Sequence, residues 1–119
     1  MIQPLTIDII CQLNQKLTGN ETDETRKSKV GSCLSSYYYY DNTHDQISSI
    51  INSIIKNHYF VDGNKRTGVL VLYLLAEFNN LTLTNNNVLK DVIIDIANNH
   101  YSIEKISSLI FEKSNDYSK

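Results

Sequence analysis

Apolar residues recur every three or four positions along most of this chain, the spacing of helices that bury one face. In the clearest case, isoleucines between Ile47 and Ile55 form one stripe, and the same stripe continues to His58. The aromatic run 37–40 has a composition typical of strands, but no partner strand is evident, so a helix end is the better interpretation. The segment 81–83 is either a short strand or an extended connector.

Polar residues mark the predicted helix ends. Thr6 is placed to cap the first helix, 5–17, and Gly19 follows its last turn. Thr43 and Gln46 fit a capping box, with Thr43 as the N-cap and Gln46 at the third helical position. Two later helices have predicted N-caps at Thr84 and Ser102.

The segment Asn64–Phe78 is apolar on nearly all sides, the pattern of a helix at the centre of a bundle. Its apolar run 69–78 is far shorter than the roughly 20 residues that a bilayer requires, so no membrane partner is expected. The whole chain, 1–119, is predicted to be a single all-α domain of about six helices around the buried central helix Asn64–Phe78.

Composition narrows the functional classes. The 11 basic and 13 acidic side chains give a net charge of −2, which argues against a general polyanion surface and against DNA as a partner. Cys11 and Cys33 form no C-x-x-C pair, so we expect two reduced, buried thiols and a cytoplasmic protein. The N-terminus has no signal-peptide pattern.

Polar chemistry is concentrated between His58 and Gly68. Asp62, Gly63 and Asn64 form a turn sequence, and the helix after it begins with free N–H groups that favour an anion. Lys65 and Arg66 lie in its first turn, where cations oppose the helix dipole unless an anion is bound between them. Phosphate is the usual anion of such sites.

Residues next to this anion site supply a candidate metal ligand and a candidate general base. Asp62 places a carboxylate beside the anion site, which suits Mg²⁺ held by substrate phosphates and one or two carboxylates. His58 is the available general base, and Phe60 is expected to anchor the loop in the core. Taken singly, each residue has a plainer interpretation as a half-buried histidine, a turn former or a solvated cation. Together they indicate phosphoryl or nucleotidyl transfer.

The order His-x-Phe-x-Asp-Gly-Asn-Lys-Arg at 58–66 resembles the signature of the Fic/Doc proteins, His-x-Phe-x-Asp/Glu-Gly/Ala-Asn-x-Arg. The resemblance implies that His58 activates a target hydroxyl and that Asp62 holds Mg²⁺. It also implies that Phe60 packs into the core. The implied phosphate-binding turn consists of Gly63, Asn64, Lys65 and Arg66.

Two chemistries occur in the family. Fic adenylyltransferases usually carry Gly where Lys65 stands and a second Arg where Val69 stands, whereas this chain resembles the Doc (death-on-curing) toxins. Doc-like activity implies transfer of the γ-phosphate of ATP to a threonine of elongation factor Tu, restrained by an antitoxin protein. Gly63, where Doc has Ala, instead resembles Fic and leaves AMP transfer as an alternative. A non-catalytic interaction protein is the second alternative.

By the same resemblance, residues 22–36 correspond to the flap that positions the target peptide in extended form. Arg26, Lys27 and Lys29 are candidates to hold that peptide, although three cations on an exposed helix are more often simply solvated. No target specificity follows from this segment.

Overall fold

The computed structural model describes residues 5–35 and 37–112 of the chain. The described residues are mainly helical, which confirms the all-α prediction, and none of their helices is long and apolar enough to cross a membrane. In chain order the elements are α1 (Ile7–Thr18), α2 (Glu24–Val30), α3 (Ser32–Ser35), the 3-10 turn η1 (Tyr37–Tyr39), α4 (Thr43–Lys56), α5 (Asn64–Phe78), α6 (Asn86–Asn98) and α7 (Ile103–Ile110).

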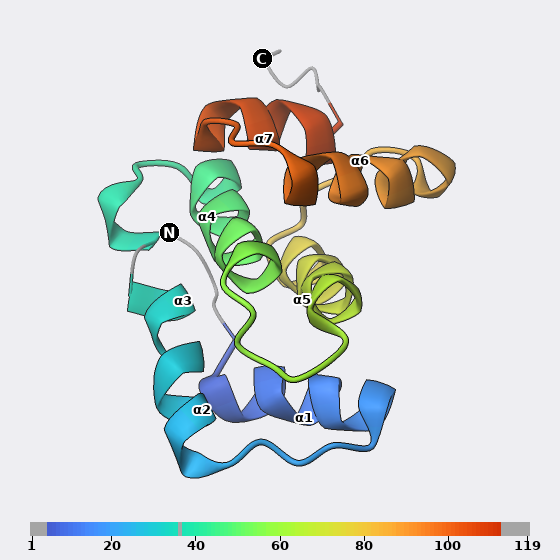
Figure 1. Ribbon diagram of the computed structural model, residues 1–119. Helices are drawn as coiled ribbons and strands as arrows, with labels where there is room; N and C mark the ends of the chain where they lie inside the picture. The colour runs from blue at the N-terminus through green and yellow to red at the C-terminus, as the bar shows by residue number, and fades with distance from the viewer. Residues whose placement is uncertain (1–4, 36, 113–119) are drawn as a thin grey trace.

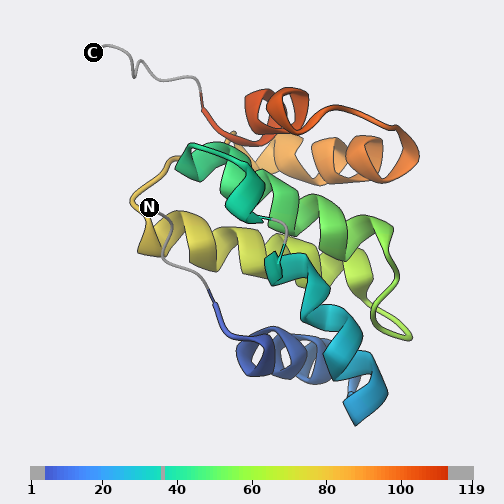
Figure 2. The same ribbon diagram turned by 90° about the vertical axis from the view of Figure 1, so that its left-hand side faces the viewer.

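Helices α4 and α5 lie side by side and run in opposite directions, with α1 packed against α5 at one end and α6 and α7 covering the other (Figure 1). Figure 2 shows α3 beside α4, with α2 continuing towards α1. The core is formed from isoleucine and leucine side chains of these helices, among them Ile50, Ile54 and Leu72, which are fully buried.

The central position is shared between two helices. α5 buries Leu72 and Leu75 against the core, but Tyr73 and Phe78 on its other side are 39% and 50% exposed. α4 has the more continuous buried surface, because even its polar Ser48 and Ser49 are buried. Tyr73 therefore lines an open groove that α5 shares with α6.

The predicted caps hold for α1 and α7. The Thr6 hydroxyl accepts a hydrogen bond from the Ile9 N–H at 3.2 Å, and Gly19 ends α1 with φ of 79°. Ser102 accepts from the Lys105 N–H at 3.1 Å. These ends are predictable because a single side chain satisfies an unpaired N–H of its own first turn.

The predicted caps of α4 and α6 are each wrong by one residue. Asn42, and not Thr43, caps α4 by accepting from the Asp45 N–H at 2.8 Å, and Asn85 replaces Thr84 at α6. Asparagine is as good a cap as threonine, so adjacent Asn and Thr residues do not fix the boundary by propensity alone. Gln46 forms no capping box: it is 7% exposed and donates to the Tyr40 carbonyl at 3.0 Å.

The aromatic run ends the short helical stretch as a 3-10 turn, η1, and not as a strand. Segment 81–83 is an extended connector. Within residues 5–35 and 37–112, its one β contact is a single antiparallel bridge between Leu83 and Phe111. That bridge joins the segment before α6 to the residue that follows α7.

Both cysteines are free and buried, as predicted. Burial raises the pKa of the Cys33 thiol to about 12 and also raises the pKa of Cys11. We therefore expect iodoacetamide at pH 8 to leave Cys33 unmodified in the folded protein and to modify both thiols in denaturant, as measured by intact mass. Alkylation of native Cys33 at the rate of the denatured chain would contradict the burial.

The same shift makes stability depend on alkaline pH. The Cys33 pKa is raised above its ordinary value of 9.0, so the unfolded chain loses this proton before the folded one does. The contribution of Cys33 to stability is complete below pH 9 and is lost as the pH rises from 9 towards 12. Urea unfolding of Cys33→Ala should therefore show a weaker alkaline decline than the wild type.

Candidate active site

The loop between α4 and α5, residues 57–63, carries the predicted chemistry. α4 ends where the Asn57 N–H donates to the Ser53 carbonyl at 3.0 Å. His58 follows with φ of 50°, a region that residues with a side chain seldom adopt, so the chain leaves the helical path there. The prediction that His58 continues the buried stripe of α4 is therefore wrong, because its side chain is exposed.

One cavity of about 380 Å³ joins the end of this loop to the start of α5. It brings together the imidazole of His58, the carboxylate of Asp62 and the cations Lys65 and Arg66. Its lining consists of Ile55, His58, Val61, Asp62, Gly63, Asn64, Lys65 and Arg66. Phe60 does not line it; this ring is 3% exposed and packs in the hydrophobic core.

Asn64 braces the loop through its side chain. Its Oδ1 accepts a hydrogen bond from the Phe60 N–H, and its Nδ2 donates to the Phe60 carbonyl, both at 3.0 Å. The side-chain amide is therefore used within the loop. Of the groups of Asn64, its backbone N–H is the one placed to meet an anion, since it belongs to the first turn of α5.

Asn14 of α1 is a second brace, and sequence reasoning missed it. The side chain is 2% exposed, and its Nδ2 donates to the Asp62 carbonyl at 2.8 Å and to Thr67 Oγ1 at 3.0 Å. One buried amide thus links the metal-binding candidate Asp62 to the first turns of α5. In the sequence, Asn14 is a polar residue beside an apolar stripe, with no local signal of this role.

Arg26 of α2 holds the loop from the other side. Its Nη1 donates to the Tyr59 carbonyl at 2.8 Å, directly after His58. Arg26 is a candidate for holding the target peptide, and in this structure its guanidinium contacts the loop backbone. The expected flap segment is helical as α2 and α3, and its last residue, Ser36, lies outside the described residues.

Gly63 makes the turn possible. Its φ is 73°, its N–H donates to Asp62 Oδ1 at 2.8 Å, and a Cβ at this position would lie 2.7 Å from Thr18 Cγ2. We expect Gly63→Ala to lower the free energy of unfolding by about 1–2 kcal/mol from backbone strain alone, with the Thr18 contact adding to this loss. Urea denaturation measures the change.

The double variant Gly63→Ala/Thr18→Ser separates the two causes. Serine keeps the hydroxyl that donates to the Asn14 carbonyl at 2.9 Å but removes the crowded methyl. Part of the lost stability should return, and the remainder measures the strain. Equal stability of Gly63→Ala and the wild type would contradict the geometry of the turn.

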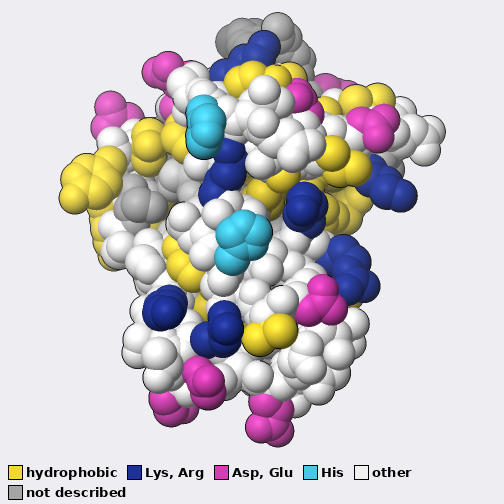
Figure 3. All heavy atoms as spheres, in the orientation of Figure 1, with side chains coloured by type: hydrophobic (Ala, Val, Ile, Leu, Met, Phe, Trp, Pro, Cys, Tyr) yellow, Lys and Arg dark blue, Asp and Glu magenta, His cyan; other side chains and the backbone are white. Residues whose placement is uncertain are grey.

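The electrostatics of the cavity favour an anion. Lys65 and Arg66 are exposed, no acidic residue lies in the first turn of α5, and neither cation forms a salt bridge within the part of the chain that the structure describes. Figure 3 shows Lys and Arg side chains and histidine on this face, while most Asp and Glu side chains lie towards its edges. A bound phosphate would be attracted by both cations and by the helix N-terminus.

Asp62 is suited to a magnesium ion that is shared with phosphates. Oδ1 of Asp62 accepts the Gly63 N–H, and the exposed carboxylate has its second oxygen left for a cation. No group of three or more His, Cys, Asp or Glu side chains that could hold a metal occurs among residues 5–35 and 37–112. A site with one protein carboxylate fits Mg²⁺, because this ion is commonly held by one or two carboxylates, substrate phosphates and water.

Comparison with known proteins places this geometry in a family. The model of the Fic/DOC family matches residues 4–76, more than half of the 119 residues, and the match includes the loop and most of α5. A search of curated proteins finds no match. The chain therefore belongs to the Fic/DOC family and is a Fic-type protein-modifying transferase.

Proposed function

We propose that the protein is a Doc-like kinase that transfers the γ-phosphate of Mg-ATP to a hydroxyl of another protein. The observation that carries this proposal is the single cavity that gathers His58, Asp62, Lys65 and Arg66 at the N-terminus of α5. These are the parts that phosphoryl transfer requires: a base, a metal carboxylate and positive groups around the phosphates.

Each side chain has a defined part in the proposed step. His58 takes the proton of the acceptor hydroxyl while the oxygen of that hydroxyl forms a bond to the γ-phosphorus. The bond between that phosphorus and the bridging oxygen breaks, and ADP leaves with the electron pair. Lys65, Arg66 and the backbone N–H of Asn64 hold the phosphate charge, while Gly63 shapes the turn and its N–H donates to Asp62. Asp62 would hold the Mg²⁺ that neutralises the phosphates.

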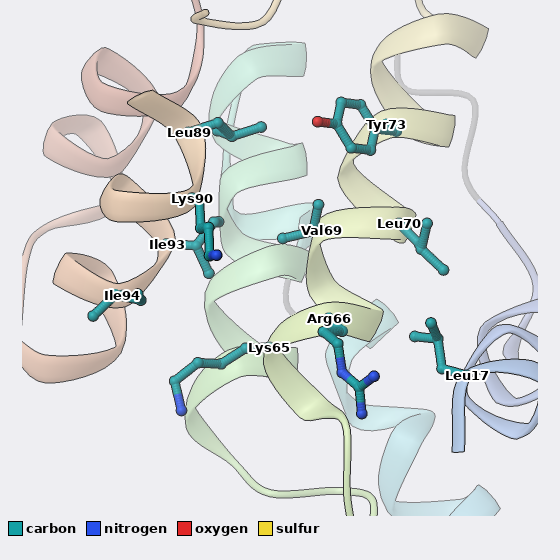
Figure 4. A pocket seen from close by; sticks show the side chains of 10 residues that line it. All are labelled: Leu17, Lys65, Arg66, Val69, Leu70, Tyr73, Leu89, Lys90, Ile93 and Ile94. Carbon is teal, nitrogen blue, oxygen red and sulfur yellow. The ribbon is translucent and has the colours of Figure 1, made fainter. Parts of the chain in front are cut away.

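Lys65 and Val69 favour phosphate transfer over AMP transfer. Both line an apolar groove of about 480 Å³ beside the cavity, and Figure 4 shows Val69 one turn along α5 from Lys65 and Arg66. The resemblance associates AMP transfer with Gly and Arg at these two positions. A valine supplies no positive charge for the α- and β-phosphates there, whereas Lys65 adds one near the phosphate that would move.

Labelled ATP distinguishes the two reactions. We expect label from the γ-phosphate to appear on elongation factor Tu, the proposed target, when the purified protein and Mg²⁺ are present. Label from the α-phosphate should stay in solution, because ADP is the leaving group. Transfer of the α-label would overturn the kinase proposal in favour of adenylylation, the alternative that Gly63 supports.

An antitoxin protein is the proposed partner that restrains the activity in the cytoplasm. The apolar groove offers a surface for such a partner, because Val69 and Tyr73 of α5 face Ile93 and Leu89 of α6 across it (Figure 4). Growth arrest on expression that disappears in Asp62→Ala would support a catalytic toxin. Arrest that persists in this variant would favour a non-catalytic interaction protein.

A further inference from the structure

A second cavity, of about 520 Å³, lies on the other side of the loop that carries His58. Its lining comes from the α2–α3 segment, from the later half of α4 and from the start of α7. Asn57 and Tyr59, the two neighbours of His58 in the chain, both line it, whereas His58 itself lines the phosphate-binding candidate cavity. The loop therefore separates two cavities, with the general base candidate at the boundary.

This second cavity is positively charged. Lys29 from α2 and Lys56 from α4 contribute to its lining, and no aspartate or glutamate does. The Lys56 ammonium donates to the Asn99 carbonyl, which fixes its position and leaves two further donors. Lys27, two residues before Lys29 in α2, differs because it pairs with Asp8 at 3.5 Å and with Glu24 at 3.9 Å.

The remaining lining suits a peptide backbone. The Tyr59 hydroxyl hydrogen-bonds Ser53 Oγ at 2.6 Å and accepts from Asn57 Nδ2 at 3.1 Å, so this part of the lining is polar and held in place. Tyr40 and Ser32 add further polar groups to the lining. Backbone N–H and C=O groups and carboxylates are the ligands that such a surface binds well.

An acceptor segment that reaches His58 passes beside this cavity, because Asn57 and Tyr59, on either side of His58 in the chain, both line it. The attacking and leaving oxygens lie on opposite sides of the moving phosphorus, and the phosphates are assigned to the cavity of Lys65 and Arg66. A hydroxyl that is deprotonated by His58 therefore enters that same cavity, and the acceptor chain on either side of the hydroxyl continues past the loop. The residues adjacent to that hydroxyl then meet Lys29 and Lys56.

We infer that this cavity is the acceptor-docking site and that it selects a protein segment with aspartate or glutamate next to the modified hydroxyl. The inference rests on the proposed phosphate transfer for the location of the nucleotide, but the charge and lining of the cavity are independent of it. It assigns Lys29 and Lys56 as specificity-determining residues that contact the acceptor and not ATP.

Binding of an acidic peptide without ATP tests the inference. The probe is a short peptide of alternating glutamate and glycine with alanine at the acceptor position, titrated into the ¹⁵N-labelled full chain. We expect amide shifts at Lys29, Ser32, Asn57 and Tyr59. The double variant Lys29→Glu/Lys56→Glu should bind roughly tenfold more weakly, because two attractive contacts become repulsive.

The matched control is Lys16→Glu/Lys105→Glu, which makes the same change in net charge on exposed residues outside this cavity and should bind like the wild type. If loss of the Lys56 contact destabilises the double variant, the single Lys29→Glu variant gives the test, because Lys29 makes no side-chain hydrogen bond or ion pair within the described part of the chain.

Four results would overturn the inference. The first is amide shifts that are absent or confined to other surfaces, and the second is a lysine-glycine peptide that binds as tightly as the acidic peptide. The third is a control variant that weakens binding as much as Lys29→Glu/Lys56→Glu does. The fourth is a single-stranded oligonucleotide that binds as tightly as the acidic peptide. The last result would indicate a general polyanion site. The probe has no hydroxyl and ATP is absent, so the peptide titration does not depend on whether phosphate is transferred. In the same way, the assay with labelled ATP does not depend on whether the acidic peptide binds.

Discussion

His58→Ala should lower the rate of phosphate transfer by about a hundredfold to ten-thousandfold, the range expected for loss of a general base. The imidazole is exposed at the cavity that also contains Asp62, Lys65 and Arg66, and it lies at the boundary with the acceptor-docking cavity. Its loss leaves the phosphate-binding groups in place. We therefore expect kcat to fall while the KM for ATP changes little, in a transfer assay with γ-labelled ATP.

The fold should tolerate this substitution because the His58 side chain is exposed. His100→Ala is the matched control: this histidine is also exposed, it lies in the connection between α6 and α7, and it lines neither cavity. Both variants should have the thermal midpoint of the wild type by circular dichroism. Full transfer activity of His58→Ala would remove His58 from the catalytic assignment.

The helices were predictable where the sequence carries its own local signals. The apolar stripes of α4 and α7 and the caps Thr6 and Ser102 act within one element, so short-range spacing is sufficient to find them. The exact starts of α4 and α6 were not predictable, because neighbouring Asn and Thr residues compete for the same capping role.

The candidate site was predictable for a related reason. Seven of the eight residues that line the phosphate-binding candidate cavity fall within 58–66, so one continuous segment supplies it. The supports of this segment come from elsewhere: Asn14 is 48 positions from Asp62, and Arg26 is 33 positions from Tyr59. A hydrogen bond between distant segments leaves no periodic signal in the sequence, so these contacts require the structure.

Asn14→Leu should lower the free energy of unfolding by about 1–3 kcal/mol, the cost of leaving buried acceptors without a donor. Leucine has a similar size and removes both hydrogen bonds from Asn14, to the Asp62 carbonyl and to Thr67 Oγ1. Because the Asp62 carbonyl then loses an anchor, the carboxylate is held less accurately. We expect transfer to fall roughly tenfold to a hundredfold as a result, since small misplacements of catalytic groups have effects of this size.

A double-mutant cycle with Thr67→Val distinguishes this brace from ordinary packing. Thr67 is fully buried, and valine keeps its shape without the hydroxyl that accepts from Asn14. Once Asn14 is leucine, the Thr67 substitution should cost less than it does in the wild type, because the shared hydrogen bond is already absent. Gln12→Leu, an exposed position of α1, should leave both stability and transfer close to the wild type. Additive losses at Asn14 and Thr67 would mean that the two residues act independently and that α1 supports the active-site loop by packing alone.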